Sequence, residues 1–173
     1  MYKIAHKYDD SAVFYFDLAG NKYVASGGNL AWRINNPVLV HIRSHFSYKN
    51  GAIGNYEGYA IFADVTCGRK ALVAWLHSKK YFESSLQVLG KHYNPKNPEK
   101  FLDQLRAIAK LPSNCKVGSL NKEEFDRLIL GIEKLCGYSS RGDETIRLLP
   151  KIIAKIENGN GREDSYLIGD LVV

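Results

Sequence analysis

The chain has 173 residues, of which 45% are hydrophobic, so it is long enough for one globular domain with a real core, which we expect to span residues 1–173. Its 24 basic and 18 acidic residues give a net charge of +6, which favours polyanions but does not choose among nucleic acid, an anionic membrane and the bacterial wall. The sequence has no apolar run of about 18 residues and its N-terminal stretch lacks an apolar signal core, so we expect neither a membrane span nor a secretory signal.

The first half of the chain predicts a small β element and a loop. Residues 12–25 alternate aromatic and β-branched residues around Gly20 and Asn21, a pattern typical of a β-hairpin. Residues 26–56 are rich in glycine, asparagine and serine and read as loop. A short strand over residues 59–62 then precedes a helix over residues 64–78.

The second half predicts helices. Helical spacing of apolar residues indicates helices over residues 82–92, 99–111 and 122–135, and a fifth helix over residues 144–157 that Pro150 would kink or delay. Residues 166–173 suit a last strand or a docked tail. The sequence therefore predicts an α+β fold that is mainly α, with a small N-terminal β-hairpin lobe.

Several kinds of chemistry have no support in the sequence. The three cysteines show no CxxC spacing and the five histidines no HExxH pattern, so we expect no metal site and no disulfide framework. The motifs of serine hydrolases, P-loops and dinucleotide-binding folds are also missing, and we expect no cofactor. Cys136 could be a nucleophile, but the nearby sequence offers it no histidine partner.

Residues 27–42, GGNLAWRINNPVLVHI, are the most informative stretch. Trp32 and Arg33 stand shortly before Asn35, Asn36 and Pro37. An aromatic plane, a guanidinium and two amides can together bind a polar, ring-shaped ligand. The alternative is a turn whose amides bond their own backbone.

The stretch resembles the Trp-Arg-Asn-Asn-Asn-Pro-Gly-Asn signature of a bacterial and phage family of lysozyme-like peptidoglycan hydrolases. Further segments resemble the same family in the same order, and together the similar segments cover about residues 13–138. These segments are Ser26 to Gly28, His45 to Gly54 (HFSYKNGAIG), Gly58 to Phe62 (GYAIF), Gly68 to Leu72 with Tyr81, and Tyr93 with Pro95 and Asn97. Residues 139–173 lie beyond the resemblance.

The resemblance implies a lysozyme-like fold, in which a glycan cleft lies between a small β-hairpin lobe and a helical lobe. It also implies action on peptidoglycan, as an antibacterial effector of a secretion system or as a phage-type lysin. We expect such a protein to be made in the cytoplasm without a signal peptide and delivered to the periplasm of a target cell. A delivered toxin would have a cognate immunity protein as partner.

The sequence departs from the family signature at four positions. Ile34 replaces the first asparagine, Val38 and Leu39 replace the Gly-Asn pair, and Cys136 replaces a glutamate of the terminal motif. These departures motivate an alternative, a non-catalytic peptidoglycan-binding or adaptor domain.

Three carboxylates are candidates for glycosidic chemistry, which needs an acid and commonly a second carboxylate. Glu57, between Tyr56 and Tyr59, is our candidate general acid, and its alternative is a solvated turn residue. Asp64 is a second carboxylate or a helix cap. Glu133, where the family motif has a glutamate, is a rival acid or a surface helix residue paired with Arg127 or Lys134.

Six residues are candidates for substrate binding. Asn35 and Asn36 match sugar hydroxyls, Trp32 and Tyr93 offer flat faces for sugar rings, and Arg33 can bind a carboxylate of the peptide stem. Asn97 joins them through the family's turn motif. Core packing is the alternative for Trp32, and a structural contact with loop carbonyls is the alternative for Arg33.

Three functions follow in order of preference. The first is a muramidase-type peptidoglycan glycoside hydrolase, and the second is the non-catalytic wall-binding domain. A basic nucleic-acid-binding protein comes third, because the basic residues are dispersed and no recognition motif is present. We therefore expect glycan strands as partners and no nucleic acid.

Overall fold

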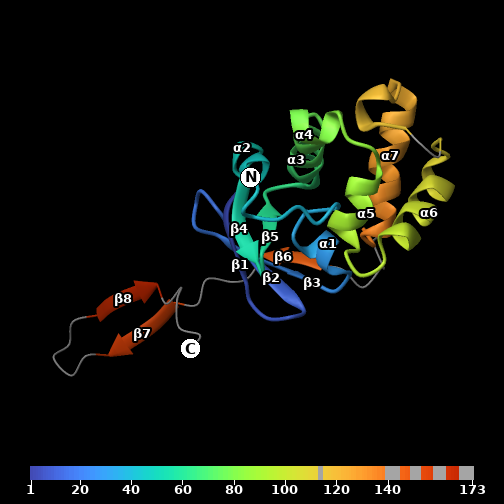
Figure 1. Cartoon of the computed structure of the whole chain (residues 1–173). Coiled ribbons are helices and arrows are strands. Elements are labelled where there is room, and N and C mark those ends of the chain that lie inside the picture. Colours follow the sequence, from blue (N-terminus) through green and yellow to red (C-terminus); the bar gives the residue numbers. More distant parts are fainter. Residues whose placement is uncertain (113–114, 139–144, 149–152, 158–162, 168–173) are drawn as a thin grey trace.

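The computed structural model describes residues 1–112, 115–138, 145–148, 153–157 and 163–167 (Figure 1). Its centre is a mixed six-stranded sheet with the strand order β5-β4-β1-β2-β3-β6. β1 and β4 are parallel, and every other neighbouring pair is antiparallel. The strands are β1 (Tyr2–Lys7), β2 (Ala12–Asp17), β3 (Lys22–Ser26), β4 (Ala52–Tyr56), β5 (Tyr59–Phe62) and β6 (Thr145–Leu148).

The predicted hairpin over residues 12–25 is confirmed as β2 and β3. Gly20 has φ +73° in the connecting turn, a conformation that glycine adopts without strain. Along β2, Tyr15 is fully buried on one face of the sheet, while Phe14 and Phe16 are only partly buried on the other. This alternation is the physical basis of the prediction.

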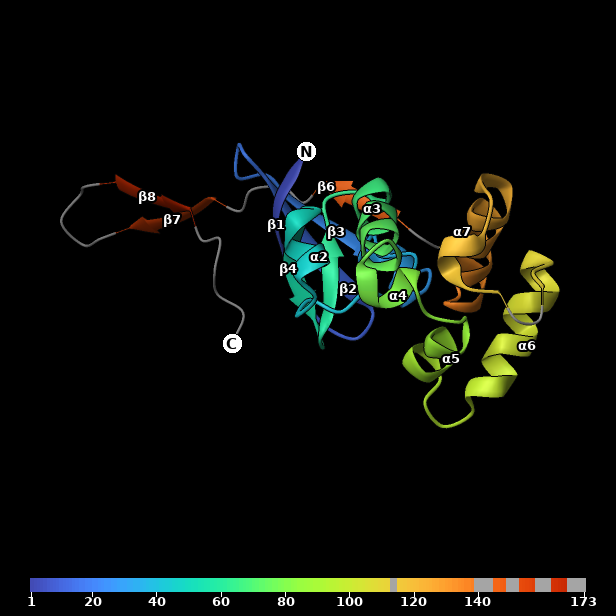
Figure 2. The same cartoon turned by 45° about the horizontal axis from the view of Figure 1, so that its top comes forward.

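The described residues form seven α-helices and one short 3₁₀ helix. α5 and α7 each pack against α6, and the three helices gather to one side of the sheet (Figures 1 and 2). The helices are α1 (Leu30–Arg33), α2 (His45–Lys49), α3 (Val65–Leu76), α4 (Lys79–Phe82), α5 (Gln87–Tyr93), α6 (Pro98–Ala109), the 3₁₀ helix (Val117–Ser119) and α7 (Lys122–Leu135).

The predicted helices over 99–111 and 122–135 are confirmed as α6 and α7. Side-chain caps fix their first turns, because Asn97 accepts from the backbone N–H of Lys100 and Asn121 forms a capping box with Glu124. Of the predicted helix over 82–92, residues 87–92 lie in α5 and Phe82 is the last residue of α4, while residues 83–86 lie in neither helix.

Two hydrophobic clusters meet at β5. Ala60 and Phe62 belong to the larger cluster, which the helices build. Ile61 faces the smaller cluster beneath the sheet, which contains Tyr15 and Ile34. Because β5 contributes to both clusters, it fixes the loop after α1 relative to the helices.

The expected mainly α, lysozyme-like fold with a small N-terminal β-hairpin lobe is wrong. The N-terminal part is a mixed sheet of six strands rather than an isolated hairpin. The missed strands, β1 and β4, form the parallel pair of Ala5 with Gly54 and of His6 with Asn55. Parallel pairing depends on segments distant in sequence, so local patterns in YKIAHK and in AIGNY gave no sign of it.

The predicted fifth helix over 144–157 is also wrong. β6 extends the sheet by pairing with β3, and β7 (Ile153–Glu157) pairs with β8 (Glu163–Leu167) in a separate two-stranded sheet. Pairing with the exposed edge of β3 overrides the helical spacing of the apolar residues. Pro150 and residues 168–173 lie outside the described residues, and the single-domain expectation for residues 1–173 stays a prediction.

Over the residues that the structure describes, none of the helices combines the length and the apolar character needed to cross a bilayer.

Candidate functional site

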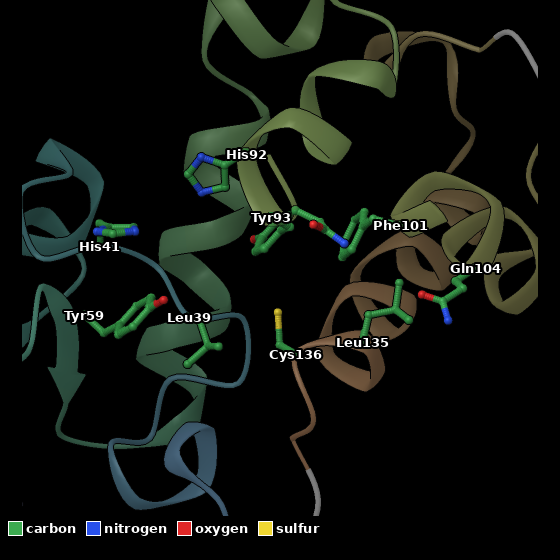
Figure 3. Close-up of a pocket in the computed structure, with 10 residues that line it drawn as sticks. Leu39, His41, Tyr59, His92, Tyr93, Phe101, Gln104, Leu135 and Cys136 are labelled. Atoms are coloured by element: carbon green, nitrogen blue, oxygen red, sulfur yellow. The ribbon is translucent and has the colours of Figure 1, made fainter. Parts of the chain in front are cut away.

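A pocket of about 310 Å³ lies between the loop that follows Pro37, the start of β5 and helices α5, α6 and α7 (Figure 3). Its lining consists of aromatic rings, imidazoles, side-chain amides and small apolar groups. The lining residues are Leu39, His41, Tyr59, His92, Tyr93, Asn94, Phe101, Gln104, Leu135 and Cys136. None of these described residues is a carboxylate, a lysine or an arginine, so the pocket suits a neutral ligand.

Aromatic rings form two walls of the pocket. Tyr93 stacks on Phe101 with ring centres 5.2 Å apart and an interplanar angle of 15°. On the opposite wall, Tyr59 lies against His41 at 4.9 Å. Figure 3 shows these pairs on the two sides of the opening. A flat ligand between them can contact ring faces, as sugars do with aromatic residues.

Two histidines approach each other at the pocket. The rings of His41 and His92 are 6.2 Å apart, and His92 also lies 4.7 Å from Trp75. The residue His92 is exposed overall, but its ring packs among these neighbours. Burial, and secondarily the nearby His41, lowers the pKa of His92 below the ordinary value of 6.5. His92 therefore presents a neutral imidazole to a ligand at neutral pH.

Cys136 caps the end of α7 and points its sulfur toward the pocket (Figure 3). Burial, followed by the proximity of Glu133, raises the pKa of its thiol to about 12. A thiol of this kind stays protonated at neutral pH, and the thiolate is the nucleophilic form. The structure therefore gives no support to Cys136 as a nucleophile.

Glu57 lies outside the pocket lining, in the turn that joins β4 to β5. Its side chain is 61% exposed and pairs with Lys7, which also contacts Asp10. Its backbone has φ +49°. The environment matches the solvated turn residue that was the alternative, and it lacks the burial that a general acid needs.

Asp64 is the N-cap of α3, where its carboxylate accepts from the backbone N–H of Cys67 at 3.0 Å. The cap was the alternative for this residue, and the geometry supports it. Its Oδ2 lies 3.7 Å from the Cys67 sulfur, and Asp64 does not line the pocket.

Glu133 is 5% exposed, and both of its oxygens are held by Arg69. It lies one turn before Cys136 on α7, behind the pocket lining rather than in it. A carboxylate with both oxygens held in this way links two helices. Arg127 and Lys134, the partners on α7 that the sequence suggested, do not make this contact.

Asn36 is fully buried and bonded on both ends of its amide. Its Nδ2 donates to the carbonyls of Val40 and Ala60, and its Oδ1 accepts from the Val40 N–H, each at 2.9 Å. The neighbouring Asn35, at φ +51°, donates to the carbonyl of Phe62 at 3.2 Å. These contacts match the turn alternative and hold the pocket loop against β5, so Leu39 keeps φ +50° while lining the pocket.

Arg33 and Trp32 also have structural surroundings. Arg33 donates to the carbonyls of Gly27 and Gly28 at 3.1 Å and of Asp10 at 2.9 Å, as expected if it holds the loop. Trp32 is half-buried against the smaller core cluster. Neither residue lines the pocket, and their roles in substrate binding stay predictions.

Tyr93 is the one sequence-predicted binding residue that lines the pocket. Asn97 lies in the adjoining turn, where its side chain caps α6 and its N–H donates to Asn94 Oδ1 at 3.1 Å. That contact orients Asn94, which does line the pocket. Asn97 is thus a neighbour of the site.

The sequence missed most of the pocket, because its residues come from five separate segments. His41 and His92 lie far apart in the sequence, and Gln104 lies inside the predicted helix over residues 99–111, so no local pattern joins the three residues. Of the lining residues, the sequence singled out Tyr93 as a binding residue and Leu39 and Cys136 as departures from the family signature. The lining residues meet only where α5, α6 and α7 lie against the loop after Pro37 and the start of β5.

Among the residues that the structure describes, no group of three or more histidine, cysteine, aspartate or glutamate side chains could hold a metal ion. Comparisons of the chain with protein-family models, with curated proteins and with solved structures found no match.

Proposed function

We propose that this protein binds a saccharide of the bacterial cell wall in the pocket between the sheet and helices α5 to α7, without hydrolysing it. The observation that carries the proposal is the lining itself. Aromatic faces and side-chain amides stand together there, and none of the described lining residues is a carboxylate. Aromatic faces contact the apolar faces of sugar rings, and amides bond hydroxyl and N-acetyl groups.

The absence of a lining carboxylate separates binding from hydrolysis. Glycosidic cleavage commonly places two carboxyl groups on either side of the bond. The three candidate carboxylates each have another structural role, Glu57 with Lys7, Asp64 as a helix cap and Glu133 with Arg69. Hydrolysis therefore lacks an identified acid, although it stays a prediction of the sequence.

The choice of a wall saccharide depends on the resemblance of residues 13–138 to peptidoglycan hydrolases. The pocket itself supports a neutral ligand of limited size, since about 310 Å³ is at the lower end of ligand pockets. We infer that it takes one N-acetylated sugar ring or the end of a glycan chain.

Retention on purified sacculi, followed by mass spectrometry of the soluble fraction, tests the proposal. We expect the protein to sediment with sacculi and to release no muropeptides. Tyr59→Ala removes one aromatic wall and should weaken retention at least about tenfold, within the range for loss of an aromatic contact. Tyr48→Ala is the matched control, because Tyr48 is 65% exposed on α2 and does not line the pocket.

Two outcomes would contradict the proposal. Release of soluble muropeptides by the wild-type protein would restore the hydrolase and identify the cleaved bond. Equal retention of the Tyr59→Ala and Tyr48→Ala variants would place the glycan contact elsewhere.

A further inference from the structure

Strands β1, β2 and β3 present a second surface, on the side of the sheet opposite Tyr15. Register places Ile4 opposite Phe16 and His6 opposite Phe14, and residues opposite each other in an antiparallel pair share a face. Phe16 is also opposite Lys22 on β3. Together with Tyr8, which follows β1, these side chains form what we call the aromatic face: Ile4, His6, Tyr8, Phe14, Phe16 and Lys22.

The aromatic face is open along β1, and half-buried at β2 and β3. Ile4 is 51% and Tyr8 47% exposed, and His6 is exposed as well. Phe14 and Phe16 are half-buried. Within the described part of the chain, neither of them packs against the two core clusters. Exposed aromatic residues grouped on one face are unusual without a ligand.

The rings and the cation of this face are arranged together. Tyr8 lies 4.3 Å from Phe14, and His6 lies 5.8 Å from Phe16. The Lys22 ammonium stands over Phe14 at 3.8 Å and near Phe16 at 5.9 Å. Phe14 and Phe16 are two residues apart on one strand, so about 7 Å separates their positions along it.

The charge on this face is positive. Asp17 is the acidic residue of β1 to β3, and its carboxylate bonds Asn21 and Tyr23 on the Tyr15 side of the sheet. In the adjoining loop, Asp9 is held by Ser11 and Asp10 by Lys7. A polyanion approaching the rings therefore meets Lys22 without an opposing carboxylate among these strands.

We propose that the aromatic face binds single-stranded nucleic acid. The Lys22 ammonium then moves from over Phe14 to a phosphate, and bases stack on the rings of Phe14 and Phe16. Unpaired bases stack on exposed rings of a sheet, whereas a duplex keeps its base faces covered. A glycan fits less well, because the six described residues of the aromatic face include no side-chain amide or carboxylate. The basic residues are dispersed in the sequence, and strand alternation gathers Lys22 with the rings.

Fluorescence anisotropy of the full chain with a short labelled oligouridine tests this proposal. We expect saturable binding at micromolar protein that is stronger for the single strand than for a duplex of equal length. Phe14→Leu with Phe16→Leu keeps apolar strand residues but removes the ring faces, and should weaken binding at least about tenfold. Lys22→Gln should lower the slope of log affinity against log salt by about 0.7.

Controls separate this site from the pocket. Tyr48→Leu and Tyr59→Ala should bind the oligouridine like wild type, and the double phenylalanine variant should still be retained on sacculi. Circular dichroism checks that each variant is folded. Absence of saturable binding, equal binding by the folded double variant, or loss of sacculus retention in that variant with unchanged oligouridine binding would each overturn the proposal.

Discussion

Arg69 on α3 and Glu133 on α7 form an ion pair with two contacts, Nε to Oε1 at 2.6 Å and Nη2 to Oε2 at 3.0 Å. Glu133 is almost fully buried, while the Arg69 side chain is 42% exposed. The hydrogen bonds that Arg69 donates to Glu133 raise the pKa of Arg69 above its ordinary value. The pair therefore joins α3 to α7, the helix whose last residue, Leu135, lines the pocket.

Removing one member of this pair should cost more stability than removing both. Glu133→Gln leaves Arg69 without its charge partner, and we expect a loss of roughly 2–3 kcal/mol, less than for a fully buried pair because Arg69 is partly solvated. Arg69→Met combined with Glu133→Leu removes both charges and should recover most of the loss. Urea unfolding measures each value, and a double variant less stable than the single one would contradict this account.

Two sequence predictions differ in outcome for one physical reason. The hairpin of β2 and β3 and the helices α6 and α7 are local, and their alternation, spacing and caps are written in adjacent residues. The parallel contact of β1 with β4 and the edge contact of β6 with β3 join distant segments. Local patterns carry little information on such pairs, so the sequence underestimated the sheet.

The candidate site follows the same division. The motif around Asn36 was recognised as a shaped loop, and it is one. The side-chain amides of Asn35 and Asn36 form hydrogen bonds with the backbone. The residues that face a ligand are therefore those that the motif holds in place, such as Leu39 and His41. A pattern of residue types cannot say whether an amide faces a ligand or its own chain, because both uses require the same residue.

Asn36→Ala tests the structural role of the motif. The substitution leaves the buried Val40 N–H without its acceptor and removes the Asn36 donor from the carbonyls of Val40 and Ala60, although the Val40 carbonyl keeps the Ala60 N–H. We expect this to cost about 2–4 kcal/mol. Asn97→Ala is the comparison, since it removes only an exposed helix cap worth about 1 kcal/mol. Thermal and urea unfolding give both values. Equal losses would show that the Asn36 contacts add nothing beyond an ordinary cap.

Gly68 on α3 should not tolerate alanine, although alanine favours a helix by about 1 kcal/mol. A Cβ there would lie 2.7 Å from the Asn35 carbonyl oxygen and 2.9 Å from Pro37 Cδ, both in the motif loop. We expect a net destabilisation of roughly 1–2 kcal/mol from overpacking. Unfolding experiments on Gly68→Ala measure it.

Gly131→Ala is the matched control on α7. The nearest atom to its Cβ is a methyl of Leu105 at 2.9 Å, at the end of a side chain that can move. We expect a smaller loss than at Gly68. The opposite order would mean that the loop, rather than the core, gives way.

Replacing Glu57 with asparagine should stabilise the folded protein. Glu57 and Gly58 have φ +49° and +94° in the turn between β4 and β5, a conformation in which Asn-Gly is strongly favoured. We expect Glu57→Asn to stabilise the fold by up to about 1 kcal/mol. Glu57→Gln removes the same charge but keeps the strained conformation, so it should give no gain. Equal stabilisation by both variants would assign the effect to charge, and sacculus retention should be unchanged in each.

His92 should make stability fall as the pH is lowered below 6.5. Burial and the nearby His41 lower the pKa of His92, so the folded state resists a proton that the unfolded chain, with an ordinary pKa near 6.5, takes up. Well above pH 6.5 both states are neutral at this residue and it adds no pH dependence. Below 6.5 the unfolded state binds more protons, so the free energy of unfolding falls until the folded pKa is passed. The titration of the His92 imidazole, followed by NMR, should have its midpoint below 6.5. His92→Gln should flatten this part of the profile of stability against pH. His6→Gln, on the aromatic face, is the control and should not reproduce that change. A His92 midpoint at or above 6.5 would mean that its ring is solvated in the free protein, and that its packing against Trp75 and His41 is lost in solution.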